Sequence, residues 1–97
     1  MKEPEIRKKA IRLLELKGYV CWYPKKVKYQ ETDVFGVYDI LAARKNKVRY
    51  IQITTYPNIS ARRKKILGFL EKNNVKIKGS EVWGYHKSKK KFIIIKI

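Results

Sequence analysis

Apolar residues recur at helical spacing in two stretches of the chain. The first covers residues 3–17, where Pro4 suits a first turn and Gly18 supplies a stop. Its apolar stripe consists of Ile6, Ala10, Leu13 and Leu14. The second follows Ser60, the expected N-cap, and ends at Asn73-Asn74, with an inward stripe of Ile66, Phe69 and Leu70. The spacing predicts an amphipathic helix in each stretch.

Five other stretches are rich in β-branched and aromatic residues and are bounded by turn signals, which is typical of strands. They are residues 19–23, 37–43, 48–55, 81–86 and 92–97. The last of them is so strongly apolar that we expect it in a central or covered position. The order is therefore αβββαββ, and residues 1–97 are expected to form a single α/β domain with a mixed sheet flanked by helices.

The second and third predicted strands form a hairpin whose register can be counted. If Lys45-Asn46 is a two-residue loop, Asp39 lies directly opposite Gln52; if the loop starts one residue later, Asp39 faces Thr54. Side chains alternate with a period of two, so both registers place these three residues on one face. The other face is the expected core side and carries Tyr38, Ile40, Ala42, Ile51, Ile53 and Thr55.

Asp39, Gln52 and Thr54 are polar positions within apolar strands. A carboxylate or amide in such a place loses water and needs a partner, which is a protein group, a metal or a ligand. Their convergence on one face predicts a functional site. The alternative is a structural Asp39 satisfied by backbone groups or a cation, with Thr54 as an ordinary strand residue.

Charge points to a polyanion as partner. The chain holds 25 Lys and Arg against 8 Asp and Glu, a net charge of +17 spread from Lys2 to Lys96. Self-repulsion of this size destabilises a compact state unless a counter-charge is present. The candidate nucleic-acid contacts are Lys25, Lys26 and Lys28, and Arg62, Arg63 and Lys64. The first set lies among aromatic residues and is equally typical of an edge strand, whereas the second would form a phosphate site at a helix start.

Several classes of protein and site are disfavoured. No apolar run approaches the roughly 20 residues of a membrane span, and the first residues do not resemble a secretion signal, so we expect an intracellular protein without a membrane partner. Cys21 and His86 are the only residues of their kinds, which disfavours a Cys/His zinc site. Cys21 is expected to pack in an apolar run, and His86 to end a strand at the surface rather than act as a general base.

The motif residues resemble a known family. The pattern Asp33-x-Phe-Gly-x-x-Asp39, followed by Gln52-x-Thr54 and Asn58-x-Ser-x-Arg62, is similar to the PD-(D/E)XK nuclease superfamily. Within it, the pattern resembles archaeal Holliday junction resolvase-like and small phage-encoded members. The resemblance covers residues 33–66 at the level of motifs and the rest by element order. It implies a restriction-endonuclease-like sheet.

The resemblance also implies Mg²⁺- or Mn²⁺-dependent endonuclease cleavage of DNA, with branched or structured DNA as a candidate substrate. It assigns catalysis to Asp39, Gln52, Thr54 and Glu5, and metal binding to Asp39, Gln52, Glu5 and Asp33. Gln52 stands where the family has an acid and Thr54 where it has a lysine. A cation would then come from Arg62, Arg63 or Lys64. For Glu5, a helix-terminus charge or a pair with Lys9 is the favoured interpretation over a direct catalytic role.

Other functions and partners remain open. The main alternative is a non-catalytic or weakly catalytic module that keeps the nuclease fold and binds DNA or RNA. A small RNA-binding or ribosome-associated protein would be favoured if Asp39, Gln52 and Thr54 lay far apart. The resemblance also implies a homodimer, with Trp22, Tyr23 and the last strand as candidate interface residues, although core packing is the favoured interpretation for each of them.

Overall fold

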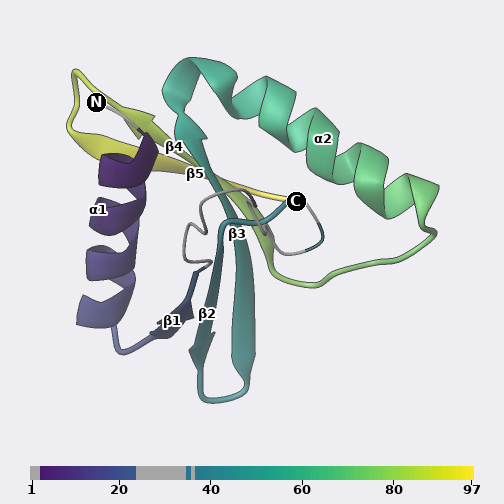
Figure 1. Ribbon diagram of the computed structural model, residues 1–97, viewed down its shortest axis with the longest axis horizontal. Coiled ribbons are helices and arrows are strands. Elements are labelled where there is room, and N and C mark those ends of the chain that lie inside the picture. The colour runs from purple at the N-terminus through teal and green to yellow at the C-terminus, as the bar shows by residue number, and fades with distance from the viewer. Residues whose placement is uncertain (1–2, 24–34, 36) are drawn as a thin grey trace, which may run out of the picture.

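Five strands form one mixed sheet in the spatial order β1-β2-β3-β4-β5 (Figure 1). The computed structural model describes residues 3–23, 35 and 37–97. The strands are β1 (Val20–Trp22), β2 (Ile40–Arg44), β3 (Lys47–Thr55), β4 (Ser80–His86) and β5 (Lys91–Lys96). Neighbouring strands run antiparallel except β3 and β4, which are parallel. The predicted α/β class with a mixed sheet is confirmed.

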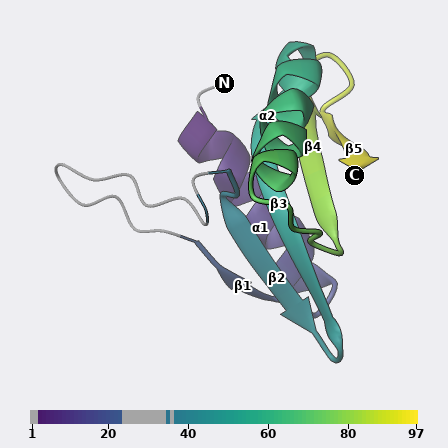
Figure 2. The same cartoon turned by 90° about the vertical axis from the view of Figure 1, so that its right-hand side faces the viewer.

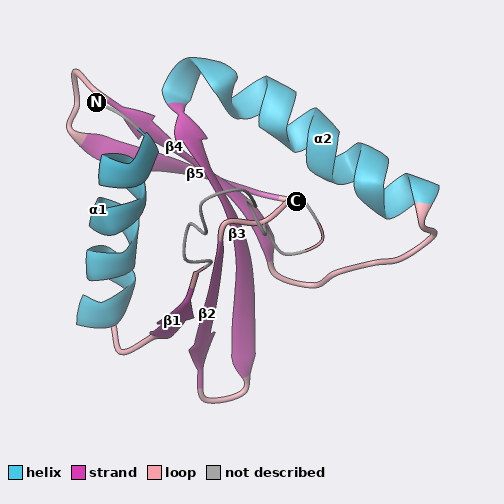
Figure 3. Ribbon diagram, viewed as in Figure 1, coloured by secondary structure: helices cyan, strands magenta, loops and turns pink. Residues whose placement is uncertain are grey.

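In the part of the chain that the structure describes, two α-helices accompany the sheet (Figure 3). Helix α1 (Glu3–Leu16) precedes β1, whereas α2 (Ile59–Lys72) joins β3 to β4 after the 3-10 turn η1 (Tyr56–Asn58). Parallel neighbours need such a crossover, so α2 is what allows β4 to lie beside β3. In the described part of the chain, no helix has the length and apolar character needed to cross a membrane.

The start of α2 differs from the prediction, because Ser60 is not the N-cap. The 3-10 turn runs directly into the helix, which begins at Ile59 with Asn58 as its N-cap. The Asn58 side chain does not cap the helix, since its Nδ2 donates a hydrogen bond of 3.0 Å to Thr55 Oγ1. Pro57 favours this tight entry because its ring fixes φ and no backbone N–H is lost from a ladder.

An apolar cluster covers each face of the sheet. On one face, α1 packs its stripe against strand residues; this cluster includes Ile6, Ala10, Leu14, Ile40, Ala42, Ile51, Ile53, Trp83 and Tyr85. On the other, Ile66 of α2 packs with Val37, Tyr38 and Val82. Because Gln52 pairs with Val82 and alternates with Ile51 and Ile53, it belongs to the α2 face. Figure 2 shows α2 in front of β3 and β4, with α1 behind the sheet.

Tyr38 lies on the α2 face, which contradicts the expectation that it shares a face with Ile40. The chain bends at Asp39 and regular pairing of β2 begins only at Ile40, so the period of two is broken there. Val37 and Tyr38 therefore enter the same cluster. The hydroxyl groups of Tyr38 and Ser80 share a hydrogen bond of 2.6 Å, which joins this bend to the start of β4.

Exposure at the sheet edges also differs from the predictions. The apolar strand β5 is an edge strand, with Ile94 partly exposed, and is not central. Trp22 and Tyr23, expected in the core, are 50% and 42% exposed. Leu13, expected in the buried stripe of α1, is 42% exposed. The strand predictions failed because apolar composition reports contact across the faces of a strand, whereas the neighbours along its edges depend on the whole sheet. Leu13 lies about 100° around the helix from the buried Leu14, so it falls at the border of the stripe.

Two glycines provide a matched test of how tightly η1 and α2 pack on the sheet. A Cβ at Gly84 in β4 would collide with the Ile59 side chain and lie 3.2 Å from Tyr56 Cα, whereas a Cβ at Gly68 in α2 would meet nothing within 4 Å. We expect Gly84→Ala to lower the free energy of unfolding by about 1–3 kcal/mol through overpacking. Gly68→Ala should raise it by about 0.5–1 kcal/mol through helix propensity. Urea unfolding measures the free energy of unfolding of both variants, and the same change in the two would contradict this packing.

Candidate active site

The β2–β3 hairpin has the first of the two predicted registers. Arg44 pairs with Lys47 and Ile40 with Ile51, so Lys45-Asn46 is a two-residue loop. Lys45 has a φ of 54°, as such tight loops require at a central position. Continuing the count beyond β2 places Asp39 opposite Gln52, and the side-chain contacts confirm this arrangement.

The Asp39 carboxylate is held by two donors from β3. Gln52 Nε2 donates to Asp39 Oδ2 over 2.7 Å, and the backbone N of Ile53 donates to the same oxygen over 2.8 Å. The backbone N of Asp39 donates in turn to Ile51 O over 2.8 Å. The carboxylate thus takes the place of a ladder carbonyl at the bend, and its position on the sheet is fixed by hydrogen bonds rather than by packing alone.

The orientation of the Gln52 amide leaves one buried oxygen without a hydrogen bond. Its Nε2 donates to Asp39 and also to Ile53 O over 3.2 Å, so a flipped amide would bring Oε1 against two oxygen acceptors. In the unflipped amide, Oε1 is buried and has no hydrogen-bond partner among the described residues. Such an atom costs free energy in a native structure, and an acceptor left in this state beside a carboxylate is suited to a cation or a bound water.

Thr54 is buried two residues further along β3 and lies on the same face as Gln52. It pairs with Gly84, at the level where η1 packs on β4. The structure therefore brings Asp39 and Gln52 into direct contact and places Thr54 on their face. Since the three residues converge, the condition that would have favoured a ribosome-associated protein is not met.

The other predicted metal ligands are not assembled by the described residues. Glu5 is exposed on α1, the helix that packs on the opposite face of the sheet. Asp33 lies outside the described residues, as do Lys25, Lys26 and Lys28. Among the residues that the structure describes, no group of three or more His, Cys, Asp or Glu side chains could hold a metal ion. The candidate ligand residues in contact are Asp39 and Gln52, and the contact is the hydrogen bond from Gln52 Nε2 to Asp39 Oδ2.

The predicted phosphate-binding cations lie in the first half of α2. Arg62 is partly buried, whereas Arg63 and Lys64 are exposed, and the first turn of the helix has no acidic residue. Because η1 and α2 directly follow β3, these cations come shortly after the end of the strand that carries Gln52 and Thr54. The positive N-terminal end of the helix dipole repels these cations, and no acidic residue in that first turn offsets the repulsion.

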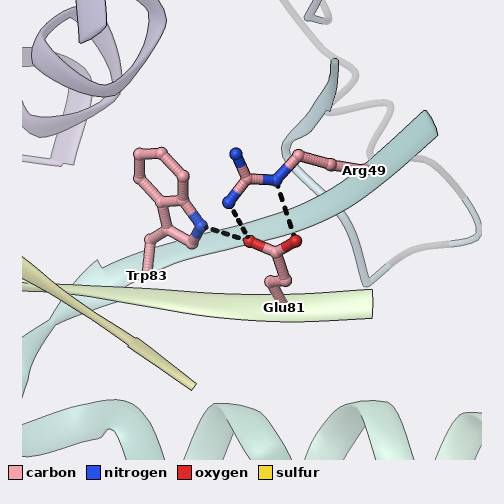
Figure 4. Close-up of polar contacts among 3 residues, drawn as sticks. All are labelled: Arg49, Glu81 and Trp83. Carbon is pink, nitrogen blue, oxygen red and sulfur yellow. Dashed lines mark hydrogen bonds and ion pairs between the residues drawn. The ribbon is translucent and has the colours of Figure 1, made fainter. Parts of the chain in front are cut away.

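A second polar cluster, absent from the sequence prediction, lies on the α1 face (Figure 4). Glu81 Oε2 accepts from Arg49 Nε over 2.8 Å, and Oε1 accepts from Arg49 Nη2 over 2.6 Å and from Trp83 Nε1 over 2.9 Å. The Arg49 guanidinium also lies over two aromatic rings, with its Cζ 5.3 Å from the centroid of the Tyr19 ring and 5.2 Å from that of the Trp83 ring. The hydrogen bonds to Glu81 raise the pKa of Arg49. Three donors already occupy this carboxylate, so the cluster is structural.

Cys21 and His86 occupy the kinds of place that the sequence predicted. Cys21 is partly buried against the α1-face cluster, and burial raises the pKa of its thiol, which makes the reactive thiolate scarcer. His86 ends β4, where its Nδ1 accepts a hydrogen bond of 3.2 Å from the backbone N of Lys89. Its ring packs on Tyr56, with centroids 4.7 Å apart. Neither residue contributes to the Asp39 and Gln52 contact.

No family model, curated protein or solved structure matches the chain. The resemblance to PD-(D/E)XK nucleases therefore stays a prediction, and it depends on this chain's own residues. The contact between Asp39 and Gln52 and the orientation of the Gln52 amide are the features on which a functional proposal can be built.

Proposed function

We propose that the chain is a metal-dependent endonuclease of the PD-(D/E)XK type, with a restriction-endonuclease-like fold, that hydrolyses phosphodiester bonds in DNA. Branched or otherwise structured DNA is the proposed substrate class. The observation that carries the proposal is the buried Gln52 Oε1, which lacks a partner among the described residues and belongs to the amide that donates to the Asp39 carboxylate. The net charge of +17 supports a polyanionic substrate.

The donor set fits Mg²⁺ or Mn²⁺ in its chemistry. Both ions prefer oxygen ligands, and Asp39 and Gln52 would hold the ion. Asp33, which lies outside the described residues, stays a candidate for a further carboxylate, whereas Glu5 belongs to the helix on the opposite face of the sheet. When bound, the ion would supply Lewis-acid stabilisation of the negative charge on the phosphate. Because Gln52 is neutral, the site carries less negative charge than a pair of acids, so we expect weak, millimolar metal affinity.

The protein residues would fix the geometry and supply positive charge. Gln52 Nε2 and Ile53 N orient the Asp39 carboxylate through hydrogen bonds of 2.7 and 2.8 Å, so no reorganisation is needed when substrate binds. Thr54 can donate a hydrogen bond but carries no charge. The stabilising cation is therefore assigned to the start of α2, where Arg62, Arg63 and Lys64 follow β3.

Cleavage under metal control tests the proposal. With millimolar Mg²⁺ or Mn²⁺, the protein should nick supercoiled plasmid and a four-way DNA junction, and excess EDTA should abolish the products. Binding of the same DNA, measured by anisotropy, should persist in EDTA, because the basic surface does not depend on the metal. An absence of products with either metal, under conditions where the DNA is bound, would contradict the proposed activity.

A second candidate function is a nucleic-acid-binding module without cleavage activity. It is favoured by the two hydrogen bonds to Asp39 Oδ2, which give the carboxylate a structural role in the bend. Gln52 and Thr54 also lack the charges that catalysis in the resembled family uses. Such a module would bind DNA or RNA in a salt-sensitive and EDTA-insensitive manner and leave no product. The nicking assay therefore separates the two functions.

A homodimer within the cell completes the proposal. Exposed Trp22 and Tyr23 lie beside the β1 edge of the sheet, and β5 forms the other edge. Exposed aromatic side chains and open strand edges are suited to pairing with a second copy. Sedimentation equilibrium tests this, and a monomer at all concentrations up to the solubility limit would rule it out.

A further inference from the structure

A basic groove of about 470 Å³ lies between α1 and the hairpin of β4 and β5, outside the candidate active site. Its lining residues are Lys8, Lys9, Arg12, Leu13, Tyr85, Lys90, Lys91 and Phe92. Five of the eight are cations and none is a carboxylate. In Figure 1 the hairpin end of β4 and β5 lies beside the N-terminal half of α1. We call this surface the α1–β5 groove.

The walls and floor of the α1–β5 groove are set by different parts of the sequence. On α1, Lys8, Lys9 and Arg12 lie outside the buried stripe of the helix and are exposed. The floor is aromatic, with the Tyr85 and Phe92 rings 5.2 Å apart, and Lys9 Nζ lies 5.9 Å from the centroid of Tyr85. Tyr85 belongs to the buried cluster under α1, so the floor is held by the core.

The charge distribution indicates a polyanionic occupant. Like charges gathered around a hollow raise its positive potential, and no lining carboxylate neutralises them. A membrane surface is a poorer match, because a helix that lies on lipid needs an exposed apolar face. The apolar stripe of α1, formed by Ile6, Ala10 and Leu14, is buried against the sheet, which leaves Leu13 and Leu16 as the exposed large apolar residues in the described part of the helix. The sugar-phosphate backbone of a nucleic acid fits the pattern, since lysine and arginine side chains bind phosphates without regard to sequence.

We propose that the α1–β5 groove binds the phosphate backbone of a DNA duplex, as a second contact surface separate from the candidate active site. Tyr85 places the groove on the α1 face of the sheet, whereas Gln52 belongs to the α2 face. Two segments of a branched or bent DNA can then be held at once on opposite faces. The inference extends the proposed function by naming where the segment that is not cleaved docks.

A pair of matched triple variants tests the groove. The groove variant combines Lys8→Gln, Lys9→Gln and Arg12→Gln, and the control combines Lys45→Gln, Lys47→Gln and Lys76→Gln. Each lowers the net charge by three, and all six residues are exposed. None of the control residues lines the α1–β5 groove. Glutamine retains good helix propensity on α1, and circular dichroism with thermal melting verifies the fold of both.

Anisotropy of a labelled DNA duplex, measured in EDTA over a salt series, is the readout. We expect the groove variant to bind roughly 10-fold or more weakly than the parent, and the control less than about 3-fold more weakly. The slope of log K against log salt should become shallower by about 2 to 3 for the groove variant, since each lost phosphate contact removes roughly 0.9.

Three outcomes would overturn the groove proposal: equal losses in the two variants, no duplex binding by the parent at low salt, or groove-dependent binding of phosphatidylserine vesicles without duplex binding. The result is independent of cleavage, because EDTA is present throughout. A parent protein that shows the groove effect but never nicks DNA would contradict the proposed nuclease while supporting the groove. A protein that nicks DNA, and whose two variants lose duplex affinity equally, would support the proposed nuclease and contradict the groove.

Discussion

Replacing Asp39 with asparagine should lower metal-dependent nicking by on the order of 100-fold or more, because the substitution removes the negative charge proposed to hold the ion. The fold should persist. Asparagine keeps one oxygen that can accept from Ile53 N and Gln52 Nε2, which donate to Asp39 over 2.8 and 2.7 Å. Initial nicking rates at saturating Mg²⁺, together with duplex binding in EDTA, measure the effect.

Asp39→Ala is the informative companion to this variant. It removes the acceptor altogether and leaves the Ile53 amide and the Gln52 Nε2 group without it, at a cost of about 1–3 kcal/mol for each buried donor that stays unpaired. Loss of activity in the alanine variant alone would therefore reflect damage to the bend between Tyr38 and Ile40. Full nicking activity in a folded Asp39→Asn protein would show that the carboxylate is structural and that the cleavage site lies elsewhere.

Glu81→Ala should lower the free energy of unfolding by about 3–5 kcal/mol, the largest stability effect that we expect from a single substitution. The carboxylate accepts from both Arg49 and Trp83, and the side chains of Arg49 and Glu81 are only 17% and 5% exposed. Alanine would leave a largely desolvated guanidinium and an indole N–H without their acceptor. Urea unfolding followed by tryptophan fluorescence measures the loss.

A double variant, Arg49→Met with Glu81→Leu, controls for the cost of the unpaired charge. Removing both partners of the ion pair leaves no unpaired buried charge and only the Trp83 indole N–H without its acceptor, so we expect stability within about 1–3 kcal/mol of the parent. A Glu81→Ala protein that loses less than about 1 kcal/mol would mean that Arg49 finds water or another acceptor. DNA cleavage should not depend on this pair, because Glu81 lies beside Ile51 on the α1 face and away from the Gln52 face.

Local rules predicted the elements and the hairpin well. The sequence allowed two positions for the two-residue loop, and in both the period of two places Asp39 on the face of Gln52 and Thr54. The structure has the loop at Lys45-Asn46, with Asp39 opposite Gln52. The same rule failed one residue earlier. Tyr38 left the face of Ile40 because the Asp39 carboxylate takes a ladder position and bends the chain, an effect of a side chain on the backbone that periodicity does not contain.

The cluster of Arg49, Glu81 and Trp83 could not be predicted in the same way. It depends on the parallel register of β3 and β4, in which Ile51 pairs with Glu81 after the α2 crossover. No short-range rule fixes that register. The sequence did contain a weak signal, because Arg49 is in phase with the buried Ile51 and Ile53, and Glu81 is in phase with Trp83. A charge in phase with core residues on each of two strands is a reason to expect a buried ion pair.

The candidate site was likewise predicted only in part. The convergence of Asp39, Gln52 and Thr54 followed from the hairpin count. The orientation of the Gln52 amide, and the buried Oε1 that it leaves without a partner among the described residues, depends on hydrogen bonds that only the folded chain defines. This oxygen is the reason why we propose a ligand site rather than a carboxylate that is merely satisfied by its neighbours.

A crystal of the protein soaked in millimolar Mn²⁺ shows whether Asp39 and Gln52 bind a metal ion. We expect an anomalous peak within coordination distance of an Asp39 carboxylate oxygen and of Gln52 Oε1, and the same peak should vanish in Asp39→Asn crystals. An Mn²⁺-soaked crystal without a peak at Asp39, at a concentration that supports nicking, would contradict the assignment of this site as the metal centre of a nuclease.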